Sequence, residues 1–486
     1  MTKFLTEKKI LFILLVLALA VRLYGIRNPI LDWHAFRQVD TASVTREYLK
    51  NGIDILRPKY HDHSNIQSGK DNPQGYRMVE FPFVNAGIAL IAKSLGLSSI
   101  DLLSRLSSVF FSLLTLVSLY FLTKKISGQK VATLSSLFFA IMPFSVYYSR
   151  VVLPEPYLLF FYTLAIWLFA EFLDSSKNWQ IFASAVSMAL AVLLKPFVLV
   201  YSLVLLTLGL SKLGLGLVKR WQLYFYPFIV ILPFVFWREW ISHFPEGIPA
   251  SDWLFDGDKL RFRPAWFRWL FWERIGKLIF GYFGLIFASA NFLALKRMHK
   301  ELFIYGSWWL GTLIYFIVVS TGNVRHDYYQ VMTLPILVIT MGRGASLLAE
   351  FLKKRFGQKM SIICITIIGG LSWLLSWQQI KGYYNINHWE YFHAGAKADQ
   401  LLPEKAKVIA PAMGDTMFLY QTNRTGWPIG FEIDDKISKG ATHYVSTSYD
   451  DETNLLIKNF ATIHQDKEVV IIDLTQRTTS ASRKEE

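Results

Sequence analysis

The sequence is poor in cysteine and in charged residues. Its 486 residues include a single cysteine, Cys364, so an intrachain disulfide bond is excluded. Only 18% of the residues are charged, whereas soluble globular proteins carry roughly 25%. Hydrophobic residues make up 53% of the chain. The composition therefore excludes a disulfide-stapled domain and is unlike that of an ordinary soluble protein.

No repeat of solenoid length occurs in the sequence. Apolar runs of roughly 18 residues recur instead, each about long enough to cross a bilayer as a helix. No small-residue cleavage site follows the first run, so we expect a retained helix rather than a signal peptide. The pattern predicts a polytopic α-helical membrane protein with about 11 transmembrane helices. The predicted spans are 9–26, 104–123, 131–149, 156–173, 179–194, 196–211, 222–238, 275–295, 302–320, 329–349 and 360–379.

The formal net charge of +15 could suggest a nucleic-acid partner. However, many of the basic residues lie in short loops between apolar runs, such as KKISGQK and KKRFGQK. These basic loops are every second loop along the chain. This is the positive-inside pattern of a membrane protein. We therefore expect no nucleic acid and a multi-pass protein of the inner or plasma membrane. Its N-terminus would be cytoplasmic, and residues 27–103 would form the first exterior loop.

The composition changes after residue 382. The stretch AKVIAPAMGDTMFLY is typical of a buried strand, a glycine turn and a helix, and THYVSTS and KEVVIIDL are typical of strands. An odd number of crossings places this region outside. We predict a membrane domain over 1–382, a small exterior α/β domain over 383–479 and a disordered tail over 480–486.

The first exterior loop opens with DWHAFRQVDT, residues 32–41. A helix here would place His34, Arg37, Gln38 and Thr41 on one face, with Asp40 one turn after Arg37. A carboxylate in this position can act as a general base toward a hydroxyl, and a guanidinium can hold a phosphate. The alternative is an interfacial helix with a solvated polar face and a simple Asp–Arg pair.

Two further features lie in the same loop. Glu80 precedes an apolar stretch, VEFPFVNAGIALIAKSLG, which is too short for a comfortable crossing and suits a helix lying in the membrane interface. His61, Asp62 and His63 could suggest a metal site. Such a tripeptide more often belongs to a flexible polar loop, so we expect a solvated loop here.

Three more polar clusters are expected on the exterior side. Glu155 lies in the RVVLPEP turn, Lys195 precedes Pro196, and a late span begins with NVRHDYYQVMTLP. A cation such as Lys195 is well placed to meet an anionic lipid headgroup, and Arg325 and His326 could bind a phosphate. The alternatives are an ordinary charged turn, a snorkelling lysine, and an aromatic belt that includes Tyr329.

In their order and sidedness these motifs resemble the GT-C superfamily of integral membrane glycosyltransferases. The similarity is to the protein O-mannosyltransferase, aminoarabinose transferase and RgtA/B/C/D-like group, and it covers nearly the whole chain. It rests on the motifs TREYLKNG, Arg105-Leu106, LPEP, LLKP and RHDYYQVMTLP, and on the exterior C-terminal domain.

The resemblance implies a glycosyltransferase that moves a sugar from a polyprenyl-phosphate donor to a hydroxyl of a lipid, glycan or protein, with inversion, on the exterior face. Asp40 would be the catalytic base, with Arg37 beside it. In many relatives an Asp-Glu pair stands about where this chain has Arg37-Gln38. That one-turn displacement leaves Asp32 as a rival base.

The same resemblance implies roles for the other polar residues. Glu155 would hold the acceptor, or a divalent cation where one is used, and Lys195 and Arg325 would lie near the donor phosphate. Glu80 would shape the cavity. The remaining expected substrate-binding residues are His34, Gln38, His326 and Tyr329. No residue set is identified as a metal ligand set, and no cofactor is certain.

Two other classes of function compete with a transferase. A transporter or flippase of lipid-linked sugars would show two similar halves and charges near the bilayer centre, and neither feature is evident. A structural scaffold would not explain why the polar clusters are all expected on the exterior side of the membrane.

Overall fold

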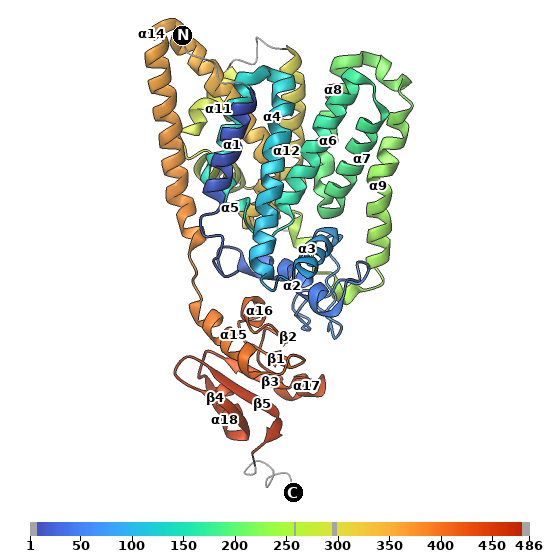
Figure 1. Ribbon diagram of the computed structural model, residues 1–486, viewed down its shortest axis with the longest axis vertical. Coiled ribbons are helices and arrows are strands. Elements are labelled where there is room, and N and C mark those ends of the chain that lie inside the picture. The colour runs from blue at the N-terminus through green and yellow to red at the C-terminus, as the bar shows by residue number, and fades with distance from the viewer. Residues whose placement is uncertain (1–6, 257–258, 294–298, 479–486) are drawn as a thin grey trace. The chain divides into compact units, whose positions relative to one another are not determined.

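The computed structural model describes residues 7–256, 259–293 and 299–478 (Figure 1). The predicted tail over 480–486 lies outside the described residues. The chain divides into two compact units, each made of three stretches of sequence. The first comprises Met1–Ile26, Arg105–Arg238 and Ser251–Tyr384, and the second Arg27–Ser104, Glu239–Ala250 and Asn385–Glu486.

The first unit is a helical bundle (Figure 1). Its α-helices are α1 (Glu7–Arg22), α4 (Ile100–Ile141), α5 (Pro143–Tyr148), α6 (Glu155–Ser175), α7 (Asn178–Leu194), α8 (Ser202–Leu213), α9 (Gln222–Ile241), α10 (Pro264–Phe267), α11 (Gly284–Leu293), α12 (His299–Val318), α13 (Ser320–Arg325) and α14 (Leu334–Ile380). Shorter helical turns join them, notably η1 (Pro196–Tyr201), η2 (Gly214–Lys219), the π-helix η6 (Arg268–Ile279), η8 (Asp327–Thr333) and η9 (Lys381–Tyr384).

Two of these helices are each interrupted by a glycine. Helix α4 has 42 residues and α14 has 47, so as straight helices they would measure about 63 and 70 Å, more than twice the ~30 Å of a bilayer core. Gly128 and Gly357 break them with nearly identical backbone angles, φ 82° and ψ 171° against φ 84° and ψ 169°. Only glycine adopts this conformation readily. Both glycines lie in the basic loops KKISGQK and KKRFGQK, so each helix is interrupted where the sequence predicts a loop, while the division into two crossings stays a prediction.

Among the described residues, five helices are long and apolar enough to cross a membrane, or six if one bent pair counts as a single span. The bent pair corrects the predicted continuous span over 275–295. Residues 264–279 and α11 meet at 117°, because Gly281 and Tyr282 take left-handed backbone angles. A β-carbon on Gly281 would lie 1.9 Å from the carbonyl oxygen of Ser372 on α14, so only glycine fits this close approach.

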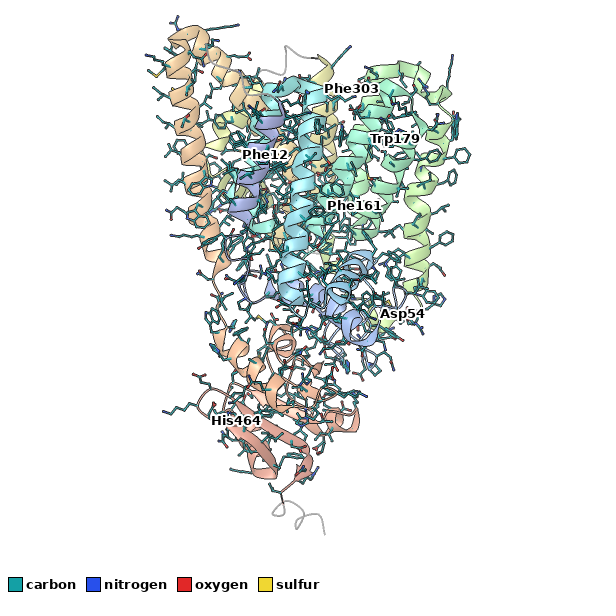
Figure 2. The ribbon with its side chains drawn as sticks, in the orientation of Figure 1. Phe12, Asp54, Phe161, Trp179, Phe303 and His464 are labelled. Carbon is teal, nitrogen blue, oxygen red and sulfur yellow. The ribbon has the colours of Figure 1, made fainter. Side chains whose placement is uncertain are left out.

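The outer surface of the bundle is apolar (Figure 2). Phe12 on α1, Trp179 on α7 and Phe303 on α12 are exposed, as are many of their aliphatic neighbours. A soluble protein rarely exposes so much contiguous apolar surface. This surface suits contact with lipid, as expected for a membrane-embedded unit.

The second unit contains a five-stranded sheet in the order β2-β1-β3-β5-β4 (Figure 1). Strand β1 is parallel to β2 and β3, and β5 is antiparallel to β3 and β4. The elements are α2 (Ala35–Asn51), α3 (Phe83–Leu95), α15 (Trp389–Leu401), β1 (Lys407–Ile409), α16 (Met417–Gln421), β2 (Thr425–Trp427), α17 (Ile433–Ser438), β3 (His443–Ser446), α18 (Asp451–Asn459), β4 (Phe460–Gln465) and β5 (Val470–Arg477).

Side chains on the two faces of this sheet enter two separate cores. Along β5, Ile471 packs with α15 and α16, whereas Val470 and Ile472 pack with α18. This is the two-residue period of a strand buried on both faces. The predicted strands in AKVIAPAMGDTMFLY, THYVSTS and KEVVIIDL are confirmed as β1, β3 and β5.

Helices α2 and α3 belong to the same unit and pack together through Val44, Tyr48, Ala86 and Ala89. Helix α3 has 13 residues, about 20 Å at 1.5 Å per residue, so it is too short to span a bilayer. The predicted short helix after Glu80 is therefore confirmed as a helix, while its place in a membrane interface stays a prediction.

Candidate functional site

The first unit brings three of the predicted clusters together. Glu155 is the first residue of α6, and Lys195 follows the last residue of α7. Their side chains form an ion pair. The ammonium of Lys195 also lies 5.2 Å from the ring centre of Tyr328 and 4.6 Å from that of Tyr329, both on η8. Residues separated by up to 174 positions thus form one cluster, which we call the lysine cluster (Glu155, Lys195, Tyr328 and Tyr329).

Lys195 is therefore not an isolated cation. Sequence distance hid its partner, because Glu155 lies 40 positions earlier. Glu155 is 1% exposed, and Lys195 compensates a buried charge that would otherwise be very costly. Within the described residues, the second carboxylate oxygen of Glu155, Oε2, has no hydrogen-bond donor. One acceptor position therefore remains for a donor from outside the protein.

Beside Tyr328 lies a buried carboxylate, Asp327, that the sequence analysis did not single out. The hydroxyl of Tyr148 donates to Asp327 Oδ1 at 2.5 Å, and that of Tyr383 donates to Oδ2. Arg274 lies 3.9 Å from Oδ2. The tyrosines fix the start of η8 and hence the position of the lysine cluster. The sequence signal was present, since Asp327 lies within the RHDYY motif.

Arg325 and His326 precede η8 and surround an indole ring. The guanidinium of Arg325 lies 5.9 Å from the ring centre of Trp253. The imidazole of His326 lies edge-on to Trp253 at 5.5 Å and stacks on Tyr328 at 5.3 Å. These contacts orient both side chains next to the lysine cluster.

In the second unit, Asp40 is the centre of a polar network. Its side chain on α2 is 2% exposed. Arg77 Nη2 lies 3.1 Å from Asp40 Oδ2, and Gln67 Nε2 donates to the same oxygen at 3.0 Å. Thr416 Oγ1 donates to Oδ1 at 2.8 Å. Sequence spacing did not reveal these partners, because they come from the polar insert of the first loop and from the turn before α16.

The other predicted residues of this loop form separate pairs. Arg37 forms an ion pair with Glu80, and the guanidinium of Arg77 pairs with Asp40. Gln38 Nε2 donates to Asp32 Oδ1 at 2.7 Å.

His34 does not lie on the predicted polar face of α2, because it precedes the first residue of the helix. It is the N-cap residue of α2, with a left-handed φ of 59°. Its ring packs 5.0 Å from that of Trp33 and 6.1 Å from that of Phe36. His34 therefore sets the start of the helix.

The expectation of a solvated loop at His61-Asp62-His63 is also wrong, because all three residues are buried. The segment pairs with the edge strand β2: Gly426 N donates to His61 O at 2.8 Å, and His63 N donates to Gly426 O at 2.7 Å. Burial raises the pKa of Asp62 to about 6 and lowers that of His61 to about 4. His61 is therefore neutral at physiological pH.

A divalent cation finds no ready site. Across residues 7–256, 259–293 and 299–478, no three His, Cys, Asp or Glu side chains are grouped so as to hold a metal ion. The donor sets around Asp40 and Glu155 consist mainly of cations and hydroxyls, which suit an anion better than a metal. The described residues thus do not fit a resident metal.

The chain matches the family model of the dolichyl-phosphate-mannose-protein mannosyltransferases over residues 87–242. A comparison with curated protein sequences finds no match. Among solved structures the chain has the fold of the GT-C membrane glycosyltransferases, so the resemblance seen in the motifs is confirmed.

Two such structures illustrate the likeness. ArnT from Cupriavidus metallidurans bound to undecaprenyl phosphate superposes with a TM-score of 0.67 at 13% identity, covering 96% of this chain and 98% of ArnT. AglB, the oligosaccharyltransferase of Archaeoglobus fulgidus, in complex with an inhibitory peptide and a dolichol-phosphate, gives a TM-score of 0.56 at 11% identity. That match covers 90% of this chain and 69% of AglB.

Proposed function

We propose that the protein is a membrane glycosyltransferase that moves a sugar from a polyprenyl-phosphate donor to an acceptor hydroxyl, with inversion at the anomeric carbon. The observation that carries the proposal is the fold shared over nearly the whole chain with ArnT bound to undecaprenyl phosphate. The lysine cluster and the Asp40 network supply chemistry that such a transfer needs.

We assign the role of general base to Asp40. An ionised carboxylate has about four acceptor positions, and three donors occupy part of this capacity. Asp40 would take the proton of the acceptor hydroxyl while that oxygen attacks the anomeric carbon. The bond between this carbon and the phosphate oxygen breaks, and the electron pair leaves on the lipid phosphate. Asp32 remains the rival base.

The lysine cluster would bind the phosphate of the lipid. Lys195 has three N–H donors and shares its charge with Glu155, which leaves donors for a phosphate oxygen. Arg325 adds a second cation near η8. Fixed cations beside the leaving phosphate stabilise the charge that develops there without being consumed.

The proposed topology follows the basic loops. We propose about eleven crossings, a cytoplasmic N-terminus and transfer on the exterior face, with 383–479 outside. Helices α4 and α14 support this proposal. Each is long enough for two crossings, and Gly128 and Gly357 divide them into two segments each.

The experiment has two stages. Mass spectrometry of envelope glycans and lipids from a deletion strain identifies the missing sugar and its acceptor. Transfer is then measured with purified enzyme, the matching lipid-linked sugar and that acceptor. We expect Asp40→Asn to abolish transfer and Asp32→Asn to retain it, with thermal unfolding as the control for folding.

The opposite pattern, an inactive Asp32→Asn and an active Asp40→Asn, would move the base to Asp32. An unchanged envelope in the deletion strain, with flux of lipid-linked sugar in proteoliposomes, would instead identify a flippase.

A further inference from the structure

A concave site lies within the second unit, lined by residues other than those of the Asp40 network. The pocket has a volume of about 290 Å³, just below the range of about 300–1,000 Å³ for small-ligand sites. Its walls come from the first exterior loop, residues 64–71, and from the C-terminal part of the chain, residues 427–439. The lining residues used below are Ser64, Asn65, Trp427, Phe431, Asp435 and Lys439.

The rim of this pocket is built from strained backbone. Phe431 and Glu432 are consecutive and both left-handed, with φ of 59° and 47°. Residues with a β-carbon rarely adopt this conformation. It places the ring of Phe431 on the rim, where 67% of the residue is exposed.

Neighbouring side chains hold the strained segment from both sides. Glu452 Oε2 accepts from the backbone N–H of Phe431 at 2.7 Å. The ammonium of Lys436, which is 7% exposed, donates to the carbonyl oxygens of Phe431 at 2.6 Å and of Gly430 at 3.2 Å. Backbone strain persists only where the surroundings enforce it, and such places are often binding sites. The phenyl ring is thus presented in a fixed position.

The charges around the pocket are largely balanced. Lys439 Nζ lies 2.9 Å from an oxygen of Asp71 and 2.7 Å from one of Asp435. Burial lowers the pKa of Lys436, whose ammonium is bound to two carbonyl oxygens. No excess positive charge remains to select a phosphate or a carboxylate. The free polar surface consists of hydroxyl, amide and carboxylate groups, which bind neutral hydroxyls well.

An exposed aromatic ring beside such groups suits a ligand with one apolar face and many hydroxyls. Sugar rings have this character, and Trp427, 5% exposed and packed edge-on against His63 at 5.7 Å, gives the pocket a rigid floor. We propose that the pocket binds a neutral sugar residue of the acceptor, with Phe431 stacking on the sugar face. This inference rests on the proposed glycosyltransferase function and adds the class of its acceptor.

The test measures binding, so it does not depend on transfer. The full-length protein is held in amphipol, which lacks a sugar headgroup, and cellobiose and mannobiose are titrated by saturation-transfer-difference NMR, with digalacturonate as the charged comparison. We expect at least one neutral disaccharide to bind and Phe431→Asn to weaken it by about three- to tenfold, the scale of one aromatic contact. Asparagine tolerates the left-handed backbone, so this variant keeps the fold.

Leu455→Ala is the matched control, because Leu455 is an exposed apolar residue on α18 outside the pocket. It should bind the disaccharide like the parent protein. Equal binding by Phe431→Asn and the parent protein, binding of neither neutral disaccharide, or a preference for digalacturonate would each overturn the inference. Transfer activity that persists alongside any of these results would leave the proposed function standing.

Discussion

The ion pair between Asp40 and Arg77 offers a quantitative test of the network around the proposed base. The guanidinium and carboxylate are 3.1 Å apart, and the side chains are 7% and 2% exposed. At an effective dielectric constant of about 20, two unit charges at this distance attract by about 5 kcal/mol. Removing one partner of a buried pair costs about 3–5 kcal/mol, because the other charge is left uncompensated.

We expect Arg77→Met to lower the free energy of unfolding by about 3 kcal/mol. The estimate lies at the low end because Gln67 and Thr416 still donate to Asp40, and each such hydrogen bond contributes about 1 kcal/mol. In the double variant Asp40→Asn/Arg77→Met neither charge of the pair remains, so it should recover at least about 2 kcal/mol relative to Arg77→Met.

The assay is denaturant unfolding of the purified full-length protein, followed by tryptophan fluorescence, for the parent, both single variants and the double variant. Arg57→Met is the matched control, since its pair with Asp54 is largely exposed and should contribute less than about 1 kcal/mol. A coupling energy between Asp40 and Arg77 below about 1 kcal/mol would refute the reasoning, because Asp40 would then be stabilised mainly by other groups.

Three further predictions follow from buried groups. Because burial raises the pKa of Asp62 to about 6, the folded state loses stability as pH rises from about 4 to 6. Asp62→Asn should therefore have a free energy of unfolding about 1–3 kcal/mol above that of the parent at pH 8 and the same free energy of unfolding as the parent at pH 4. A constant difference across this pH range would contradict the titration. Lys195→Met should abolish stabilisation by added undecaprenyl phosphate in thermal-shift measurements, and Glu155→Gln, which keeps the cation, should retain it; loss in both variants would mean that the pair acts only structurally. A β-carbon on Gly344 would lie 1.8 Å from a carbonyl oxygen of α11, so Gly344→Ala should lower stability by about 1–3 kcal/mol, while Gly306→Ala, which has open space, should change the melting temperature little.

The helical character of the first unit could be predicted from the sequence because its signals are local. Apolar runs indicate helical segments, and a glycine within a basic loop marks a break, as at Gly128 and Gly357. Of the about 11 predicted spans, the described residues show five or six helices long and apolar enough to cross a membrane. The prediction of a continuous span over 275–295 was wrong because the bend in this segment depends on close packing of Gly281 against α14. No local pattern encodes that contact. Strand β4 was missed for a similar reason, since much of its sequence, FATIHQ, is polar and partly exposed at the sheet edge.

The residues of the candidate sites were found more easily than their partners. Asp40, Glu155 and Lys195 stand out as polar residues near apolar runs. Their pairing does not, because Arg77 lies 37 positions from Asp40 and Glu155 lies 40 from Lys195. The burial of His61-Asp62-His63 likewise depends on pairing with Gly426, far along the chain. Sequence therefore predicts which groups are present, and the fold decides which groups meet.

The hydrogen bond from Thr416 to Asp40 also sets an order of events during synthesis. The two residues are 376 positions apart. At about 5–20 residues per second on the ribosome, Asp40 precedes Thr416 by roughly 20–75 seconds. Residues 27–103 are thus synthesised long before the segment that closes this network. The hydrogen bond from Thr416 to the proposed base therefore forms only after residue 416 has been synthesised, and a chain that stops earlier lacks it.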